Sequence, residues 1–578
     1  MVYLTCIELL MGEVLMKILK IELDNFRVFN KAELDLSACT AIIGQNNAGK
    51  SAILQALRVF FNPAAALKGE GVPKHGKRNH WINITLTFSD AATFTPTGWS
   101  SRPEFRVRMR FKPLNRALTY DFFVGPTSVK QCTYDHELVQ ALFNNIRFVY
   151  VPAIRNHKEA EWQDGSVLYE LVQTILLDRR SNQARKHFSQ AIQSLQDKIL
   201  SKIAKEVSDV YVGPDKPNIA ITFPANIDEK FLMRELRIEI AEATKQFGAE
   251  EIGSGTQSLM VLALHQALAE LTKTTYVLGI EEPEMGLHPQ AQHFVGQAMA
   301  HGIAKRIQVI ITTHSPHIVN SLGYQQCVLV NKIPGKDVPT STVRQVTGGL
   351  SAARSEGFKK FWQAHKTDVL FARGVIVVEG RADEAVFRLL LERLEINPMD
   401  HGVSFLQVDG VNNLPYVFPL LRHLEIPYHV VLDKDYFFPY ANKNKKLSYG
   451  ATSILYRQSF KTSGIKILQD LGIDSAAISN LEPALLRSTF RAKRVLKNKH
   501  LTVMVNNLEA DLVYWSLGHA ASQRVLSVST NPADILNMEK IKDPTTLVEI
   551  VSLLVAQEDL PLSYQYVGMR LKGFLETL

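Results

Sequence analysis

The sequence predicts an α/β protein with two domains, each built on a parallel sheet. Two observations support this fold class. Near the N-terminus, apolar strands lead into a glycine-rich turn and a helix, and from Gly374 onward strands alternate with helices through Leu432. Strand–helix alternation is typical of parallel sheets with helical crossovers. A chain of 578 residues is also too long for one ordinary core.

The first half alternates apolar segments with turns. Residues 81–88 alternate apolar and polar side chains, which predicts an edge strand. Residues 158–207 contain few Gly or Pro and are expected to be helical, whereas the polar residues 334–356 are expected to form a linker. The other expected strands are 17–23, 34–43, 105–111, 147–152, 276–280 and 308–312, and the expected helices are 51–61, 259–271 and 289–301.

In the second half, strands are expected at 375–378 and 428–432, and helices near 479–496 and 545–556. The domain boundaries that follow are an N-terminal extension 1–15, a first domain in two parts (16–159 and 246–335) around an insert 160–245, a linker 336–373 and a second domain 374–578. Met16 is the expected start of the folded chain, although the true start, Met1 or Met16, stays open.

Composition excludes several classes of protein. No run of 18 apolar residues appears, so no membrane span is expected, and the first residues lack the features of a signal peptide. The four cysteines, Cys6, Cys39, Cys132 and Cys327, are scattered, which argues against a zinc site or disulfide scaffold and fits a reducing cytoplasm. A net charge of +8 permits a polyanionic partner without proving one.

A phosphate-binding turn is predicted between the strand 34–43 and the helix 51–61. Its sequence is Gly44-Gln45-Asn46-Asn47-Ala48-Gly49-Lys50-Ser51, which fits G-x-x-x-x-G-K-[ST]. Glycines allow backbone N–H groups to wrap phosphate oxygens, and the following helix directs its positive end at them. Lys50 would contact the β- and γ-phosphates of ATP, and the Ser51 hydroxyl would ligate Mg²⁺.

Two acids end the apolar strand 276–280. We expect Glu281 to hold the metal through a water and Glu282 to act as general base toward the attacking water. Further along the chain, Ser254 and Gly255 stand in a Gly-Ser-Gly turn, and His314 follows the strand 308–312. Each of these patterns is common when it occurs alone.

In this order, the motifs resemble those of ABC ATPases of the SMC/RecF branch. The resemblance implies that Ser254 and Gly255 contact the γ-phosphate of ATP bound to a second subunit. It also implies that His314 is a switch histidine that senses the γ-phosphate, and that Arg27 lies near the nucleotide. Such heads close the site between two copies, so a homodimer or higher oligomer is implied. ABC proteins generally have Asp where Glu281 stands, and the longer side chain is expected to slow hydrolysis.

A second site is predicted where the strands 375–378 and 428–432 end. Glu379 follows the first strand and Asp433-Lys434-Asp435 follows the second, with Asp383 four residues after Glu379. The carboxyl ends of parallel strands meet at one sheet edge, so these carboxylates should converge. Carboxylate oxygens are hard ligands suited to Mg²⁺ or Mn²⁺, and two such ions could promote phosphodiester hydrolysis. A Glu after one strand and D-x-D after another is the Toprim pattern.

An ABC head followed by a Toprim domain resembles the OLD (overcoming lysogenization defect) family of nucleases, which includes the nuclease subunit of the Gabija antiphage system. The resemblance implies metal-dependent DNA cleavage regulated by ATP, and a helical dimerisation insert at 160–245. It further implies an acidic motif, matched by Glu509 and Asp511 as candidate second-metal ligands, and a catalytic lysine. Lys542 is favoured over Lys540 for that lysine, but the spacing leaves both open.

Basic residues cluster near these acids and would suit non-specific contact with DNA phosphates, although about half of them are expected to be ordinary surface residues. They are Lys443, Lys445, Lys446, Arg487, Arg491, Lys493, Arg494, Lys497 and Lys499.

The function expected is therefore an ATP-regulated DNA endonuclease in antiphage defence, working alone, with a helicase, or with a retron reverse transcriptase and its DNA. The alternative is a non-catalytic RecF-like DNA-binding repair mediator, against which the complete set of acids argues. A topoisomerase would need a tyrosine domain and a primase a zinc module, and neither is evident. What triggers cleavage, and whether ATP activates or inhibits it, stays open.

Overall fold

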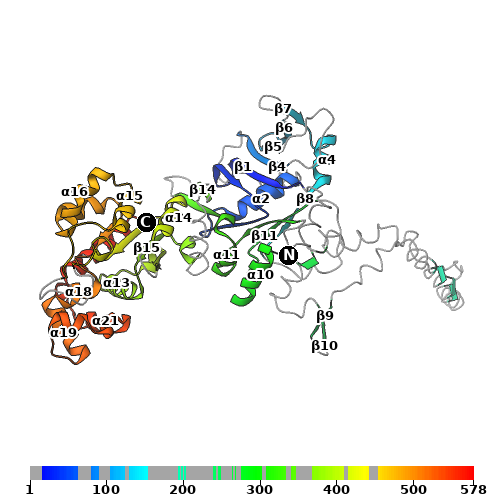
Figure 1. Cartoon of the computed structure of the whole chain (residues 1–578). Helices are drawn as coiled ribbons and strands as arrows, with labels where there is room; N and C mark the ends of the chain where they lie inside the picture. Colours follow the sequence, from blue (N-terminus) through cyan, green and yellow to red (C-terminus); the bar gives the residue numbers. More distant parts are fainter. Residues whose placement is uncertain are drawn as a thin grey trace, which may run out of the picture. The chain divides into compact units, whose positions relative to one another are not determined.

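The structure is a computed structural model of the whole chain (Figure 1). It describes residues 16–62, 80–89, 104–123, 129–153, 275–301, 307–333, 340–345, 367–408, 414–441 and 454–578, with short pieces between 190 and 267. The chain divides into two compact units. The first comprises Met1–Ile42, Gly49–Ser321 and Pro334–Thr340, and the second Ile43–Ala48, Leu322–Ile333 and Ser341–Leu578.

A six-stranded sheet underlies the nucleotide motifs, with strand order β14-β13-β3-β12-β11-β8. Strands β3 (Cys39–Gly44), β12 (Ile307–Thr312), β11 (Thr275–Glu281) and β8 (Ile146–Val151) pair in parallel. All six residues of β3 and of β12 are buried, as expected for strands covered on both faces. Helix α2 (Lys50–Phe61) packs against β8, β11 and β12. The remaining strands are β13 (Cys327–Ile333) and β14 (Thr340–Gln345).

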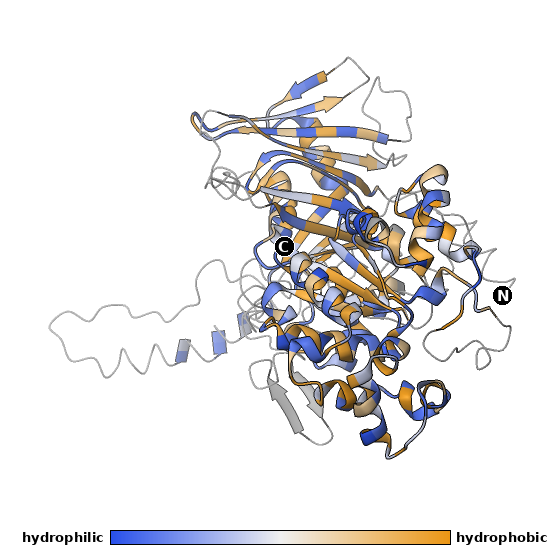
Figure 2. Ribbon diagram, turned by 90° about the vertical axis from the view of Figure 1, so that its left-hand side faces the viewer, coloured by the Kyte–Doolittle hydropathy of each residue, from blue (hydrophilic) through white to orange (hydrophobic). Residues whose placement is uncertain are grey.

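A second, antiparallel sheet has the order β2-β1-β4-β5-β6-β7. Its strands are β1 (Ile18–Phe26), β2 (Phe29–Asp35), β4 (Ile82–Ser89), β5 (Glu104–Lys112), β6 (Ala117–Phe123) and β7 (Val129–Cys132). The prediction that 81–88 forms an edge strand was wrong, since β4 lies between β1 and β5. Because β1 and β5 flank β4 on either side, even its polar side chains Thr85 and Thr87 are buried. Strands at the top of Figure 2 show the alternation of polar and apolar residues that such a sheet requires.

Three other segments differ from their predicted form. Residues 34–43, expected as one strand, divide into the end of β2 and β3, because the chain turns at Ser37, whose N–H donates to Thr40 Oγ1 at 3.0 Å. The expected linker 336–373 contains β14 and a short 3-10 helix, η5 (Thr367–Phe371). The helix expected at 479–496 is two helices, because Ser488 between them has a left-handed φ of 51°.

The Toprim-type sheet has the order β16-β15-β17-β18, and every pairing is parallel. Its strands are β15 (Gly374–Val378), β16 (Val403–Gln407), β17 (Tyr428–Leu432) and β18 (Leu501–Val503). The predicted fold class, an α/β protein with a parallel-sheet second domain, is confirmed. Helices α13 (Arg381–Arg393) and α14 (Leu414–His423) follow β15 and β16 along the chain.

The C-terminal helices share one hydrophobic core with this sheet. Ile376 and Phe405 of the strands lie in the same cluster as Leu547 and Leu571 near the C-terminus. The helices after β17 are α15 (Thr462–Asp470), α16 (Ser475–Leu486), α17 (Phe490–Lys497), α18 (Leu508–Val513), α19 (Ser516–Leu526), α20 (Pro532–Leu536), α21 (Pro544–Ser552) and α22 (Leu562–Leu575).

Parts of the predicted organisation lie outside the described residues: the extension 1–15, most of the insert 160–245, and the turn with Ser254 and Gly255. At the end of the insert, predicted to be helical, β9 (Glu239–Glu242) and β10 (Lys245–Gly248) form an antiparallel pair. The other described helices of the first unit are α4 (Glu137–Asn145), α10 (Pro289–His301) and α11 (Pro316–Ser321). Among the described residues, no helix has the length and apolar character needed to cross a membrane.

Candidate nucleotide site and candidate metal centre

The glycine-rich turn is possible only with glycine at two positions. Gly44 has φ 139°, and a Cβ there would lie 2.2 Å from the Val330 carbonyl oxygen. Gly49 has φ 108°, and a Cβ there would lie 2.5 Å from Val28 Cγ2. At both positions, the positive φ and the short distance to the added Cβ exclude an ordinary side chain. The turn from Gln45 to Ala48 is closed by the Ala48 N–H, which donates to the Gln45 carbonyl at 3.3 Å.

Lys50 is the first residue of α2 and is buried although it is charged. Burial lowers the pKa of its ammonium group to about 8, against the opposing attraction of Glu282 and Glu284. No acidic residue stands in the first turn of α2, whose positive end therefore adds to the field of Lys50. Ser51, next along the helix, is exposed. A helix N-terminus with a desolvated cation favours an anionic ligand such as a triphosphate.

The predicted base and sensor come together beside Lys50. The Glu282 N–H donates to the Thr312 carbonyl at 2.8 Å, and its φ of 43° turns the chain out of the β11 ladder. Glu282 Oε1 lies 3.7 Å from His314 Nε2. Burial, and then the charge of Lys50, lower the pKa of His314 in spite of Glu282, so its imidazole is neutral at pH 7. A neutral imidazole can act as donor or acceptor toward a phosphate oxygen.

Glu284 is a residue of this site that the sequence prediction did not use. Its Oε1 accepts a hydrogen bond from the His314 N–H at 2.6 Å. Burial raises its pKa, although the His314 hydrogen bond opposes the shift. Glu284 thus connects the loop after β11 to the loop after β12. The Glu-Glu-Pro-Glu run was the available signal, because its last carboxylate lies within reach of the next strand end.

Glu281 ends β11 and interacts with Tyr150 of β8. The pKa of Tyr150 is raised mainly by burial and then by the charge and hydrogen bond of Glu281. The positive charge of Arg27 lowers the same pKa. Arg27 therefore lies near this end of the sheet, in the two-residue turn between the paired Phe26 and Phe29. Both predicted residues, Glu281 and Arg27, are brought to the same region as Lys50.

Three of the predicted metal ligands converge in the second unit. Glu379, Asp433 and Asp435 each offer a carboxylate oxygen, and these oxygens all lie within 4.8 Å of one another. Glu379 follows β15, and the two aspartates follow β17, its direct parallel neighbour. The pairing of these two strands places their carboxyl ends, and hence the acids, side by side. This spacing is suited to a divalent cation bound between hard oxygen ligands.

Two further acids surround these three. Burial, followed by the charges of Glu379 and Glu509, raises the pKa of Asp383 to about 7. The pKa of Asp433 is raised well above its usual value by burial first and then by Asp383, Asp435, Glu379 and Glu509. Asp383 also caps α13, since its Oδ2 accepts from the Gly380 N–H at 2.9 Å. Desolvation together with mutual repulsion favours occupation of this half-buried site by a cation.

Asp511 accepts a hydrogen bond at each of its carboxylate oxygens. Its Oδ2 accepts from the Val505 N–H at 3.0 Å and its Oδ1 from Asn506 Nδ2 at 2.9 Å. The Asn506 carbonyl in turn accepts from the Lys434 N–H at 2.7 Å. Both carboxylate oxygens are therefore engaged in holding the turn after β18 against the D-x-D segment. Asp511 therefore has a structural role in this turn, and its ligation of a second metal stays a prediction.

Residues after D-x-D that the sequence analysis did not identify hold Asp435. Tyr440 donates its hydroxyl proton to Asp435 Oδ2 at 2.6 Å, and its ring stacks on Tyr456 with centroids 5.6 Å apart. Lys461 Nζ donates to the Asp435 carbonyl. Lys434, between the two aspartates, points away, and its Nζ donates to Ser488 Oγ at 2.8 Å. No motif spacing indicates these contacts.

The two candidate lysines both lie in a short 3-10 helix, η10 (Glu539–Lys542). Lys540 and Lys542 are exposed, and Ile541 between them is buried and anchors the segment in the core. Within the described part of the chain, no hydrogen bond or ion pair joins either lysine to the acids. The choice of Lys542 over Lys540 therefore stays a prediction.

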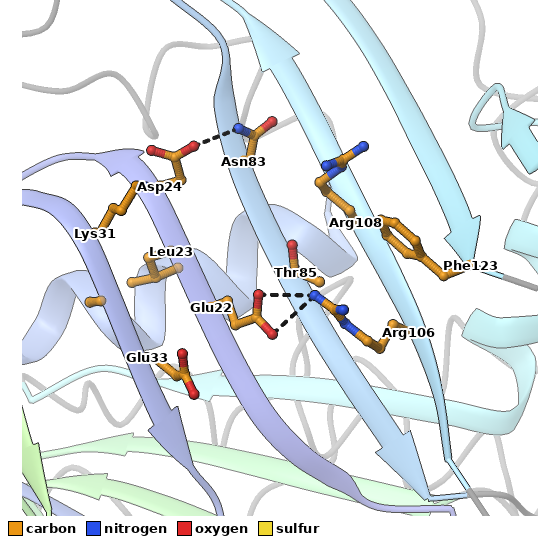
Figure 3. Close-up of a pocket in the computed structure, with 11 residues that line it drawn as sticks. Glu22, Leu23, Asp24, Lys31, Glu33, Asn83, Thr85, Arg106, Arg108 and Phe123 are labelled. Atoms are coloured by element: carbon orange, nitrogen blue, oxygen red, sulfur yellow. Dashed lines mark hydrogen bonds and ion pairs between the residues drawn. The ribbon is translucent and has the colours of Figure 1, made fainter. Parts of the chain in front are cut away.

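A polar pocket of about 380 Å³ on the antiparallel sheet contains none of the predicted residues (Figure 3). Two cross-strand contacts lie in it: Arg106 Nη2 is 3.0 Å from Glu22 Oε2, and Asn83 Nδ2 donates to Asp24 Oδ2 at 2.9 Å. Cross-strand pairs of this kind stabilise a sheet face exposed to water. We assign no ligand to this pocket.

Comparison with protein families identifies both parts of the chain. A model described as "AAA ATPase domain" (AAA_15) matches residues 16–147 and 144–319, together more than half of the chain. A model described as "Overcoming lysogenization defect protein-like, TOPRIM domain" matches residues 370–435. These ranges contain the glycine-rich turn and His314 in one case, and Glu379, Asp433 and Asp435 in the other.

Similar curated proteins carry related names. The chain is 26% identical to "OLD nuclease" of Thermus scotoductus, over 72% of this chain and 81% of that protein. It is 23% identical to "Old nuclease" of Escherichia phage P2, over 73% and 77% of the two chains. It is 20% identical to "Endonuclease GajA" of Bacillus cereus strain VD045, over 79% and 81%.

Among solved structures, the chain is similar to an Smc head domain from Pyrococcus furiosus with a TM-score of 0.37 and 14% identity, covering 57% of this chain and 97% of that one. A TM-score this low does not define the fold. The fold is defined by the sheet topology and by the two family matches. The chain belongs to the family of the AAA_15 ATPase domain and carries, C-terminal to it, a TOPRIM domain of the overcoming lysogenization defect type.

Proposed function

We propose that this protein is an ATP-regulated, divalent-metal-dependent DNA endonuclease of the OLD family that acts in antiphage defence. The observation that carries the proposal is the convergence of Glu379, Asp433 and Asp435 within 4.8 Å at the carboxyl edge of the parallel sheet. The names of the similar curated proteins, which are nucleases and endonucleases, support this chemistry.

The donor set suits Mg²⁺ or Mn²⁺. Several half-buried carboxylates lie close together, and the raised pKa values of Asp383 and Asp433 reflect first their desolvation and then this mutual repulsion. A divalent cation bound there would supply a Lewis acid and a water of lowered pKa. Asp435 is oriented for this role by Tyr440, and Asp383 is fixed by its hydrogen bond to Gly380. Glu509 is the candidate for a second ion, and Lys542 for stabilising charge on the phosphate.

The ATPase domain would act as a nucleotide sensor. Lys50, Ser51 and the N–H groups of the glycine-rich turn would bind the ATP phosphates, Glu282 would activate water, and His314 would report the γ-phosphate. We infer slow hydrolysis, because Glu281 replaces the shorter Asp of related heads. Closure would need a second copy to supply Ser254 and Gly255, so we propose a homodimer or higher homo-oligomer. In this proposal the protein acts alone, with a helicase, or with a retron reverse transcriptase and its DNA.

Incubation of supercoiled plasmid with the full chain and Mg²⁺ or Mn²⁺ tests the nuclease. The proposal expects nicked or linear products, and loss of those products in Glu379→Ala and in Asp433→Ala. Absence of cleavage by the parent protein under every metal condition, or unchanged cleavage by either variant, would refute it.

A further inference from the structure

A cavity of about 730 Å³ lies in the Toprim unit, away from the acids. It opens between α17 and α22, beside the amino ends of β17 and β18. This volume falls within the range of small-ligand sites. The lining residues are His429, Lys493, Arg494, Lys497, Asn498, His500, Tyr566, Met569, Arg570, Gly573, Phe574 and Thr577.

The cavity lies at the opposite sheet edge from the proposed metal centre. His429 is the second residue of β17, whereas Asp433 follows its last residue. A five-residue strand spans about 16 Å at about 3.3 Å per residue. A ligand in the cavity therefore could not be held by the carboxylates, and the cavity is a separate site.

The lining is strongly cationic. It includes Lys493, Arg494, Lys497 and Arg570 and contains no carboxylate. Among the residues that the structure describes, none of these four cations forms an ion pair with an acid. Like charges gathered without counter-charges are unfavourable, so this surface is suited to a polyanionic ligand.

Arg570 provides a specific donor toward that ligand. Its Nη2 donates to the Lys497 carbonyl at 3.2 Å, which fixes the plane of the guanidinium. Its Nε is buried and has no hydrogen-bond partner in the described part of the chain. A buried donor without a partner is destabilising, and a phosphate oxygen would supply the missing acceptor.

The two histidines of the cavity, His429 and His500, add no positive charge to its lining at pH 7. Burial, then the charges of Arg570 and His500, lower the pKa of His429 well below its usual value, and burial and Arg570 lower that of His500. Both imidazoles are therefore neutral at pH 7. A ring nitrogen of His429 lies 3.0 Å from Thr502 Oγ1, which keeps it within the core.

One wall of the cavity is aromatic and apolar. Lys493 Nζ lies 4.5 Å from the centroid of the Tyr566 ring, and Phe574 and Met569 line the same wall. Met569 has 59% of its surface exposed, so this wall offers apolar surface to a ligand. At Gly573, a Cβ would meet no atom within 4 Å, so this residue faces the open space. A planar ring could lie on this wall while its anionic group contacts the cations.

We propose that this cavity is a second ligand site that binds a nucleotide, with the phosphate on Arg570 and Lys493 and the base against Tyr566 and Phe574. The nucleotide could be a free nucleoside monophosphate or the terminal residue of a DNA strand, since both present the same phosphate and base. The site does not depend on the proposed nuclease activity and would remain if that activity failed.

Titration calorimetry of the full chain tests the proposal, with EDTA to prevent cleavage and Lys50→Ala as common background to weaken nucleotide binding in the ATPase domain. The probes are deoxyadenosine monophosphate and a 5′-phosphorylated thymidine hexamer. The background protein should bind at least one of them with a Kd below about 1 mM. Arg570→Gln combined with Lys493→Gln should weaken this binding at least tenfold.

Gly573→Leu is the more decisive variant. A Cβ at Gly573 would meet no atom within 4 Å and the change replaces a helix glycine, so the thermal midpoint should not fall, while the added side chain should occupy the cavity. It should abolish binding, whereas Lys572→Gln, an exposed change on the same helix, should not change it. Binding of the monophosphate alone identifies a free nucleotide, binding of the hexamer alone identifies a strand end, and binding of both fits either. Binding of neither probe, or equal binding by Gly573→Leu, would overturn the proposal, whether or not plasmid is cleaved.

Discussion

The nucleotide site and the Toprim site each hold charged groups that are partly withdrawn from water, a lysine at the glycine-rich turn in the first and a cluster of carboxylates in the second. In the first, burial lowers the pKa of the Lys50 ammonium group to about 8. In the second, burial and mutual repulsion raise the pKa of Asp383 to about 7 and that of Asp433 well above its usual value. Each region therefore holds its charge at a cost that a ligand of opposite sign would offset. The first is suited to a triphosphate and the second to a divalent cation.

The largest effect is expected from Asp433→Asn. Loss of a ligand from the proposed centre should reduce plasmid cleavage at least about a thousandfold, an effect of about 4 kcal/mol. Removal of one of several repelling carboxylates should leave the thermal midpoint without metal equal or higher, and metal should raise it less than in the parent. Glu392→Gln, an exposed change on α13, is the control and should behave as the parent. A lowered midpoint together with lost cleavage would indicate misfolding instead.

The second prediction concerns the buried cation of the nucleotide site, Lys50. Lys50→Ala should weaken ATP binding about a hundredfold, or about 2.7 kcal/mol, because the buried cation beside the phosphates is lost. Without nucleotide the stability should not fall, since the variant removes a desolvated charge. Titration calorimetry with ATP and Mg²⁺ measures the ATP affinity, and scanning calorimetry without nucleotide measures the stability. Lys31→Ala, an exposed change on β2, is the control. Equal ATP affinity in Lys50→Ala and Lys31→Ala would show that the turn is not the nucleotide site.

The lysine pair of η10 gives the next effect in size. If Lys542 stabilises charge on the phosphate, Lys542→Ala should slow plasmid cleavage about a hundredfold and Lys540→Ala less than threefold. Both residues are exposed and lie two apart, so each variant is a matched control for the other. The reverse ranking would assign the role to Lys540, and equal small effects would remove both from the mechanism.

The smallest effect is expected at Glu281. Glu281→Asp restores the shorter carboxylate of related heads and should raise steady-state ATP hydrolysis about threefold to tenfold while ATP affinity stays the same. Glu282→Gln, which removes the proposed base, should abolish hydrolysis and serves as the lower reference. A fall in hydrolysis in Glu281→Asp would mean that the longer side chain is required, for example to keep its hydrogen bond with Tyr150 of β8.

Local motifs predicted the centre of each site because strand ends and tight turns are determined by nearby residues. The convergence of Glu379, Asp433 and Asp435 follows from parallel pairing, and Gly44 and Gly49 follow from the backbone of the turn. The hydrogen bonds of Asp511 to Val505 and Asn506 could not be foreseen from the acidic motif alone, because they depend on how the turn after β18 folds back.

Tertiary contacts between distant segments account for what the sequence analysis missed. Tyr440 is held against Asp435 by stacking on Tyr456, sixteen residues later, and Lys461 approaches from the start of α15. Neither contact has a periodic or spacing signal. The error at β4 has a similar origin, because the burial of Thr85 and Thr87 depends on β5, which returns beside it.

The central claim is that nucleotide in the ATPase domain controls cleavage by the Toprim carboxylates. Plasmid cleavage by the full chain in Mg²⁺ or Mn²⁺, with and without ATP, tests it most directly. We expect the two rates to differ at least about tenfold, which corresponds to a coupling free energy of about 1.4 kcal/mol, and we expect Lys50→Ala to show no difference. Identical rates with and without ATP in the parent protein would contradict the claim.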